Sequence, residues 1–169
     1  SPAINSSLAK VFTGRRGEMN LKIGTANLKV GDVIQIRWFS PKQRQDPIIE
    51  SIYGNTDLEI GSHHWSSPNR AVVIQTTSVT AISDSRISIG DPLLHDITES
   101  MTVDIASWQH LTEIGIEDIA LIFPDSPSFG HHLEQGYNGI YLTGVRNSWI
   151  RNISVLNADS GILTYNSAN

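Results

Sequence analysis

An internal repeat restricts the folds open to this chain more than any other feature of its sequence. The segment GIYLT at residues 139–143 recurs as GILTY at residues 161–165. The segment IEDIAL at residues 116–121 is matched by IRNISV at residues 150–155, and the spacing of this second match is longer. The shorter spacing, about 22 residues, lies in the range of solenoid repeats, in which each copy stacks on the next.

The two spacings differ by 12 residues, and the sequence shows where the difference arises. Residues 124–138 stand in the first copy where the second copy has only residues 158–160. The repeating unit is therefore about 22 residues long and carries one insertion. Short apolar strands separated by polar corners, in units of this size, are typical of a right-handed parallel β-helix.

In such a coil, equivalent side chains of successive copies stack at the strand spacing of about 4.8 Å. Glu117 beside Arg151 is then an exposed ion pair, which gives a check on the register. Four aliphatic pairs are expected to point inward and form a continuous core: Ile116 with Ile150, Ile119 with Ile153, Leu121 with Val155, and Ile140 with Ile162.

The sequence before the repeat predicts a separate, smaller β-structure. The turn at Gly31-Asp32 precedes a short apolar strand, and alternating residues over 72–89 predict a hairpin. Residues 40–70 are rich in Pro, Gly, Asn and Ser, which predicts long loops with one short element near 48–53. We predict an all-β chain in which residues 1–100 form an N-terminal β-unit and residues 101–169 form the first coils of the β-helix.

Composition excludes several classes of function. The net charge is −5 and the 12 Lys and Arg residues are mostly scattered, so no basic face for a nucleic acid is expected. The chain has no cysteine, which excludes disulfides and thiolate metal sites. No window approaches the roughly 18 apolar residues of a membrane span.

Four segments carry a resemblance to a known superfamily: VGDVIQIRW, SRISIGDPLLHDI, IGIEDIALIF and GYNGIYLTGVRNSWIRNISVLNADSGI. Together they resemble the bacterial right-handed parallel β-helix proteins of the pectate-lyase-like superfamily, in the branch where a small β-unit precedes the solenoid. The resemblance covers roughly residues 28–36 and 80–169. It implies a secreted or extracytoplasmic protein that acts on polysaccharides as a lyase, hydrolase or epimerase. The calcium-binding aspartates and the arginine base of characterised pectate lyases have no recognisable counterpart in this sequence.

The insertion is the first candidate for a functional site, because loops on a regular scaffold often carry function. It contains His131 and His132 and ends at Tyr137, and the matching corner of the next coil carries Asp159. A histidine with a tyrosine can abstract the C5 proton of a uronic acid and protonate the leaving oxygen. We assign these four residues as candidate catalytic groups. The alternative is that the histidines only cap and pack the insertion.

Glu134, Arg146 and Asn157 are the candidate substrate-binding residues around this loop. Arg146, or a bound cation, would offset the carboxylate charge of an acidic polysaccharide. Asn157 also suits a corner, since asparagine accepts the left-handed conformation that a sharp bend requires.

Metal sites are less well supported by the sequence. Adjacent histidines on an extended chain point to opposite faces, which disfavours a metal at His131-His132, and His63-His64-Trp65 has the same difficulty. Calcium is the one cofactor that the carboxylate density suggests, but the segment GDPLLHDI fits better as a turn after a strand. The candidate calcium ligands are Asp91, His95, Asp96 and Asp104.

Two functions remain open. The first is an enzyme that degrades or modifies an acidic polysaccharide, and the second is a non-catalytic structural or adhesive solenoid. A solenoid needs at least about three coils, whereas this sequence stops inside a repeat at SGILTYNSAN. We therefore expect either a piece of a longer protein or a chain whose β-helix is completed and extended by other chains. Trp108 and Trp149 are expected to close cores rather than to bind sugar.

Overall fold

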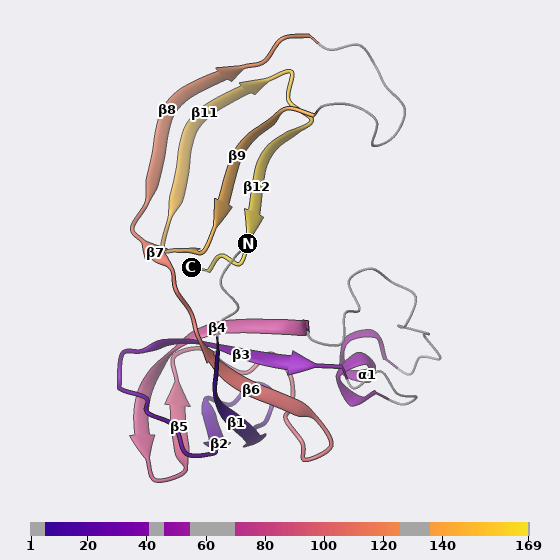
Figure 1. The fold of residues 1–169 in the computed structure, drawn as a ribbon, viewed down its shortest axis with the longest axis vertical. Coiled ribbons are helices and arrows are strands. Elements are labelled where there is room, and N and C mark those ends of the chain that lie inside the picture. Colours follow the sequence, from indigo (N-terminus) through magenta and orange to yellow (C-terminus); the bar gives the residue numbers. More distant parts are fainter. Residues whose placement is uncertain (1–5, 41–45, 55–69, 126–135, 169) are drawn as a thin grey trace. The chain divides into compact units, whose positions relative to one another are not determined.

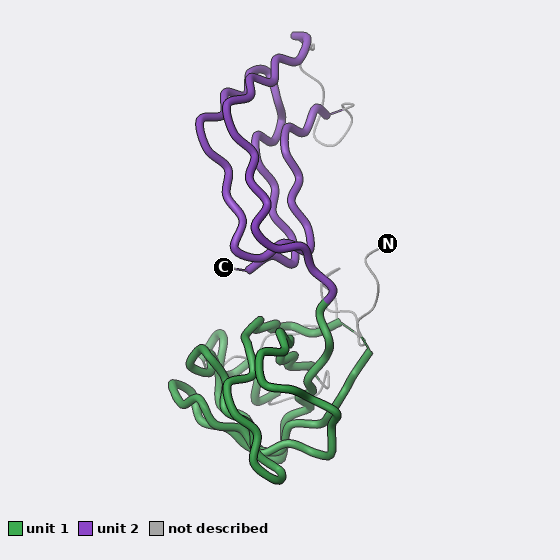
Figure 2. The backbone as a smooth tube through the Cα atoms, turned by 90° about the vertical axis from the view of Figure 1, so that its left-hand side faces the viewer, with its two compact units in different colours: residues 1–108 green, residues 109–169 purple. Residues whose placement is uncertain are grey.

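The computed structural model describes residues 6–40, 46–54, 70–125 and 136–168. These residues are mostly β-structure and belong to two compact units, Ser1–Trp108 and Gln109–Asn169 (Figure 2). The boundary between the units lies after Trp108, eight residues later than the 100/101 boundary expected from the sequence. The reason is strand β6 (Thr102–Ser107), which pairs with strands of the first unit on both of its edges.

Unit 1 is a closed barrel of six antiparallel strands, in the order β1-β2-β5-β4-β3-β6 (Figure 1). Closure gives each of these six strands two pairing partners. The strands besides β6 are β1 (Ser7–Thr13), β2 (Asn20–Ile23), β3 (Val33–Phe39), β4 (Ala71–Ser83) and β5 (Arg86–Ile89).

Local sequence accounts for the turns of the barrel. Gly31 has φ of 94° and opens β3, as the sequence predicts, because glycine adopts this conformation without steric cost. Asp84, at φ of 48°, makes the turn of the predicted hairpin between β4 and β5. The helix α1 (Pro47–Tyr53) is the short element expected near 48–53. Asp46 is its N-cap, since the Asp46 side chain accepts a hydrogen bond from the Ile48 amide, and Gly54 is its C-cap.

The barrel interior is a packed apolar core. Its residues come from every strand and from α1, and its largest fully buried side chain is Trp38. The indole of Trp38 donates a hydrogen bond to the backbone oxygen of Asp96 at 3.3 Å, so its one polar atom has a partner. Arg37 and Asp104 form a two-bond ion pair at 2.7 and 2.8 Å between register partners on β3 and β6.

The described strands of unit 2 form three parallel pairs. All three pairs join the two copies of the repeat, which confirms the register that the repeat and its insertion predict. The pairs are β7 (Leu111–Thr112) with β10 (Val145–Arg146), β8 (Gly115–Ile122) with β11 (Trp149–Leu156), and β9 (Asn138–Thr143) with β12 (Ser160–Tyr165). The two longer pairs, β8 with β11 and β9 with β12, can be followed in Figure 1.

The four predicted aliphatic pairs are all register partners. Their burial, however, differs from the continuous core that the sequence predicts. Ile119 is 42% exposed and Ile162 is 50% exposed, and among the described residues of this unit only Val145 is a buried hydrophobic side chain. Each described ladder joins only two strands, so every side chain has a stacked neighbour on one side and the ladders form without a closed core.

The bends of unit 2 are made by residues with positive φ. Six of them form three pairs at the same offsets as the strands, so these bends stack on their equivalents, whereas Asn157 has no positive-φ counterpart at Phe123. The stacked pairs are Glu113 with Asn147, Asp118 with Asn152, and Gly144 with Asn166. One such residue bends the chain without a loop, which is why β8 and β11 each continue through a bend.

In the part of the chain that the structure describes, no helix is long and apolar enough to cross a membrane.

Candidate functional site

The corner at the base of the insertion brings together two of the predicted site residues. Tyr137 precedes β9, and Asp159 precedes β12 at the equivalent position of the second copy. The backbone amide of Asp159 donates to the Tyr137 carbonyl at 2.9 Å, and the Tyr137 amide donates to Asp159 Oδ2 at 2.6 Å. Two hydrogen bonds thus join the end of the insertion to the second copy of the repeat.

A second aromatic ring completes this corner. The ring of Phe123 stacks on that of Tyr137, with centroids 5.1 Å apart and an angle of 17° between the planes. Phe123 follows β8 and Tyr137 precedes β9, so the stack joins the two ends of the insertion. We did not predict a role for Phe123 from the sequence. The signal was the repeat itself, which aligns Phe123 with the corner residue Asn157.

Asn157 holds the same corner through its side-chain amide. Its Nδ2 donates to the Phe123 carbonyl at 3.0 Å and to Asp125 Oδ1 at 2.8 Å. Its φ of 59° makes the bend after β11, which agrees with the corner role weighed from the sequence. We name Phe123, Tyr137, Asn157 and Asp159 the insertion corner. It combines an aromatic stack with amide and carboxylate groups at an exposed turn.

Arg146 does not join the insertion corner. It lies on β10, which follows β9, whereas Tyr137 immediately precedes β9. A six-residue strand such as β9 is about 20 Å long. The structure therefore places Arg146 at the opposite end of this strand from Tyr137 and Asp159. The predicted role of Arg146, to offset the charge of a substrate carboxylate, stays a prediction.

The remaining predicted site residues, His131, His132 and Glu134, lie outside the described residues, as does the His63-His64-Trp65 segment.

The acidic residues considered as calcium ligands are engaged elsewhere. Asp91 accepts a hydrogen bond from Thr77 Oγ1 at 2.8 Å, and Asp104 is paired with Arg37. Asp96 accepts from the Arg16 amide at 2.8 Å. Within the described ranges no three His, Asp or Glu side chains are grouped so that they could hold a metal ion. The turn interpretation of GDPLLHDI fits these contacts.

His95, the fourth of these residues, sits against the barrel. Its Nδ1 lies 2.8 Å from Ser51 Oγ of α1, and its ring contacts the edge of Trp38. Burial lowers the pKa of His95 from its ordinary value of 6.5, and the positive charge of Arg16 lowers it further, while Asp96 acts in the opposite direction. The contact with Ser51 joins α1 to the segment after β5.

The two tryptophans expected to close cores have different environments. Trp108, at the end of unit 1, is only 5% exposed. Trp149, the first residue of β11, is 44% exposed, which contradicts the expected core role. The sequence pattern suggested burial because Trp149 begins an apolar strand. Its indole instead lies on the side of β11 opposite to that of Ile150.

Comparison with known proteins gives structural neighbours only. No protein-family model and no curated protein matches the chain. The tailspike protein gp49 from Pseudomonas phage LKA1 aligns with 96% of this chain at a TM-score of 0.60 and 18% sequence identity.

Two further tailspikes each align with 96% of this chain and have lower TM-scores. Gp61 of Pseudomonas phage phi297 has a TM-score of 0.44 at 13% identity. Gp54 of Acinetobacter baumannii bacteriophage AP22, solved with A. baumannii capsular saccharide, has 0.41 at 11%. The chain spans 23%, 34% and 26% of the lengths of these three proteins. Its fold is therefore similar to that of a segment of a phage tailspike protein.

Proposed function

We propose that this chain is part of an extracytoplasmic, tailspike-like protein that binds a polysaccharide, with the insertion corner as its primary binding site. The observation that carries the proposal is the meeting of Tyr137 and Asp159 at the base of the insertion. Aromatic rings beside a few fixed polar groups are typical of small-ligand sites. Sugars suit such a site because they present both an apolar ring face and hydroxyl groups.

Two further observations support the fold on which this proposal rests. The parallel pairs of unit 2 have the register of stacked coils, and Arg146 forms a parallel bridge with Ala168, where a third coil would begin. We infer that the unit is the start of a right-handed parallel β-helix, as the pectate-lyase-like resemblance implies. The gp49 tailspike is similar to this chain across both units.

Catalysis is an extension of the same proposal. His131 and His132 belong to the insertion whose ends meet at the corner, so they are available as the general acid and base of a lyase or glycoside hydrolase. The expected substrate is an acidic polysaccharide. Calcium plays no part in the proposed mechanism.

Binding and cleavage can be tested separately. The chain is applied to an array of bacterial capsular, O-antigen and uronic-acid polysaccharides, and the double variant Tyr137→Ala/Asp159→Ala is compared with it. The proposal predicts that the unchanged chain binds at least one polysaccharide and that the double variant loses this binding. If a folded double variant still binds the polysaccharide, the insertion corner is not the binding site.

Cleavage is measured by the release of reducing ends or of unsaturated uronic acid from the bound polysaccharide. The variant His131→Ala/His132→Ala is expected to bind but not to cleave. If this variant cleaves as fast as the unchanged chain, the catalytic assignment of the histidines is wrong. Binding without any cleavage by the unchanged chain would make the protein an adhesin.

A non-catalytic solenoid that assembles with other chains is the second candidate function. It is favoured by the open edges of unit 2, whose described strands form three separate two-stranded sheets. Ile119 and Ile162 on these sheets are half-exposed, and coils from another chain would cover them. Light scattering tests this candidate: a concentration-dependent oligomer supports it, and a monomer over the whole range contradicts it.

A further inference from the structure

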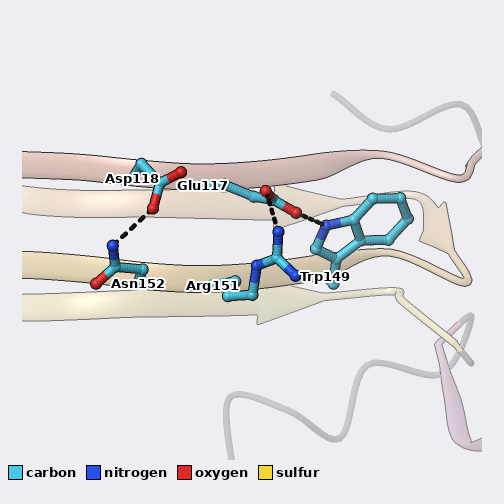
Figure 3. Close-up of polar contacts among 5 residues, drawn as sticks. All are labelled: Glu117, Asp118, Trp149, Arg151 and Asn152. Carbon is cyan, nitrogen blue, oxygen red and sulfur yellow. Dashed lines mark hydrogen bonds and ion pairs between the residues drawn. The ribbon is translucent and has the colours of Figure 1, made fainter.

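Three side chains form an ordered cluster on the outward side of β8 and β11 (Figure 3). The indole Nε1 of Trp149 donates to Glu117 Oε1 at 2.5 Å, and Arg151 Nη2 donates to Glu117 Oε2 at 2.6 Å. Arg151 is the register partner of Glu117, and Trp149 lies two positions before Arg151 on the same face of β11. We name Trp149, Glu117 and Arg151 the Trp149 platform.

The indole of the platform is held in place before any ligand arrives. A Cβ atom on Gly115 would come within 2.5 Å of the Trp149 ring, so the indole lies directly against the backbone of its register partner. The bond to Glu117 fixes the ring a second time. Nevertheless 44% of Trp149 is exposed. A ring that is already fixed loses little conformational entropy when a ligand stacks on it.

The edge of the platform is polar. The Arg151 side chain is 71% exposed and that of Glu117 is 30% exposed. A guanidinium has five N–H donors, so one bond to Glu117 leaves most of them for other partners. A second polar pair lies beside the platform, where Asn152 Nδ2 donates to Asp118 Oδ1 at 2.6 Å (Figure 3).

This mixture of surfaces favours a sugar over a protein partner. Acidic residues are depleted in the core of protein interfaces, whereas here the exposed indole is bonded directly to the carboxylate of Glu117. A pyranose ring matches the platform in both respects. Its C–H face is apolar and can cover the indole, while its equatorial hydroxyl groups lie near the ring plane, where they reach donors and acceptors at the edge.

The geometry points to a second saccharide subsite, in which a pyranose ring of the bound polysaccharide stacks on Trp149 and its hydroxyl groups bond to Arg151 and Glu117. This inference rests on the proposed function. It is separate from the insertion corner, because the platform is formed at the start of β8 and β11 and the corner follows their ends. A chain of sugar residues could therefore contact unit 2 at two places.

The test is calorimetric titration with the polysaccharide that binds the unchanged chain in the array. Trp149→Ala is expected to weaken binding at least about tenfold, since an aromatic anchor that is truncated commonly has an effect of this size. Trp149→Phe keeps a stacking surface and should retain most of the affinity. Arg151→Ala, at an exposed position, should weaken binding severalfold without changing the melting temperature.

Glu117 has two roles in this scheme, because it bonds to the sugar and also orients Trp149 and Arg151. Glu117→Gln can still accept the indole N–H and should bind better than Glu117→Ala at equal thermal stability. The matched control is Tyr141→Ala, which removes another exposed aromatic ring of unit 2 from a different strand pair. The control is expected to bind as tightly as the unchanged chain.

The outcomes separate the two proposals. If Tyr137→Ala/Asp159→Ala abolishes binding while folded Trp149→Ala and Arg151→Ala bind normally, the insertion corner is supported as a binding site and the subsite at the Trp149 platform is contradicted. Equal losses in Trp149→Ala and Tyr141→Ala would also overturn the platform, since any exposed ring would then suffice. If the unchanged chain binds no polysaccharide on the array, the proposed function fails and the subsite with it.

Discussion

Single residues with left-handed backbone set the shape of unit 2. Asp118 and Asn152 have φ of 56° and 51°, in the middle of paired strands that would otherwise run straight. Asparagine and aspartate tolerate this conformation better than other residues with a side chain. Their own hydrogen bond at 2.6 Å then links the two bends. The sequence motif IRNIS therefore describes a bend as well as a strand.

Replacing Asn152 by alanine should destabilise this bend. Alanine at positive φ costs about 1 kcal/mol or more, and the bond to Asp118 is lost as well. Asn152→Gly loses the same bond but accepts the backbone, so it should be milder than Asn152→Ala. Hydrogen exchange of the β11 amides measures the local effect. Equal protection in the alanine and glycine variants would show that the backbone conformation is not the cause.

His95 gives the barrel a dependence on pH. The pKa of His95 is lowered in the folded chain, first by burial and then by Arg16. The unfolded chain therefore takes up the proton at higher pH, and the free energy of unfolding falls as the pH drops below the ordinary value of 6.5, until the lowered pKa is reached. Between about pH 7 and pH 5 the melting temperature of His95→Gln should fall less than that of the unchanged chain. An identical fall in both proteins would exclude this role.

At the level of strands and corners, the repeat was the strongest signal in the sequence. It predicted the register of β8 with β11 and of β9 with β12, including the Glu117–Arg151 pair, because identical spacing places like residues side by side. Exposure could not be predicted in the same way. Trp149 reads as a core residue in its strand, but its burial depends on which face of β11 it occupies and on Gly115 leaving room for the ring.

The barrel strands were predicted less completely than the coils. The alternation over 72–89 indicated a hairpin, and its turn at Asp84 is correct. The pairing of β1 with β6, however, joins residues nearly a hundred positions apart. No local period marks such a contact, so closure of the barrel was beyond sequence reasoning. The partners of Asp91, Asp96 and Asp104 depend on the same long-range arrangement.

The insertion should be dispensable for the coil but not for the function. If residues 124–138 are replaced by Ala-Asp-Ser, the corner of the second copy, both coils have the same length. The register of β8 with β11 should survive, because those strands lie before the insertion and after β9. Circular dichroism and hydrogen exchange test the fold, and the polysaccharide array tests the loss of binding. Loss of β-structure in this variant would mean that the insertion supports the coil.

For the molecule as a whole, the two units rest on different sources of stability. Among the described residues, every buried hydrophobic side chain except Val145 belongs to unit 1. Each strand of the barrel also has two pairing partners. Unit 2 has hydrogen-bonded parallel strand pairs with half-exposed ladders, so buried apolar packing contributes less to its stability.

Separating the units tests this difference. Residues 1–108 expressed alone should unfold cooperatively on heating, because the barrel keeps its whole core, with Trp38 and Ile105 fully buried. Residues 109–169 expressed alone should show no cooperative transition, since at least about three stacked repeats are needed for a stable solenoid. Scanning calorimetry of both pieces gives the answer. A sharp transition in the 109–169 piece would show that two coils and their bend ladders suffice, and the assembly candidate would then lose its main physical support.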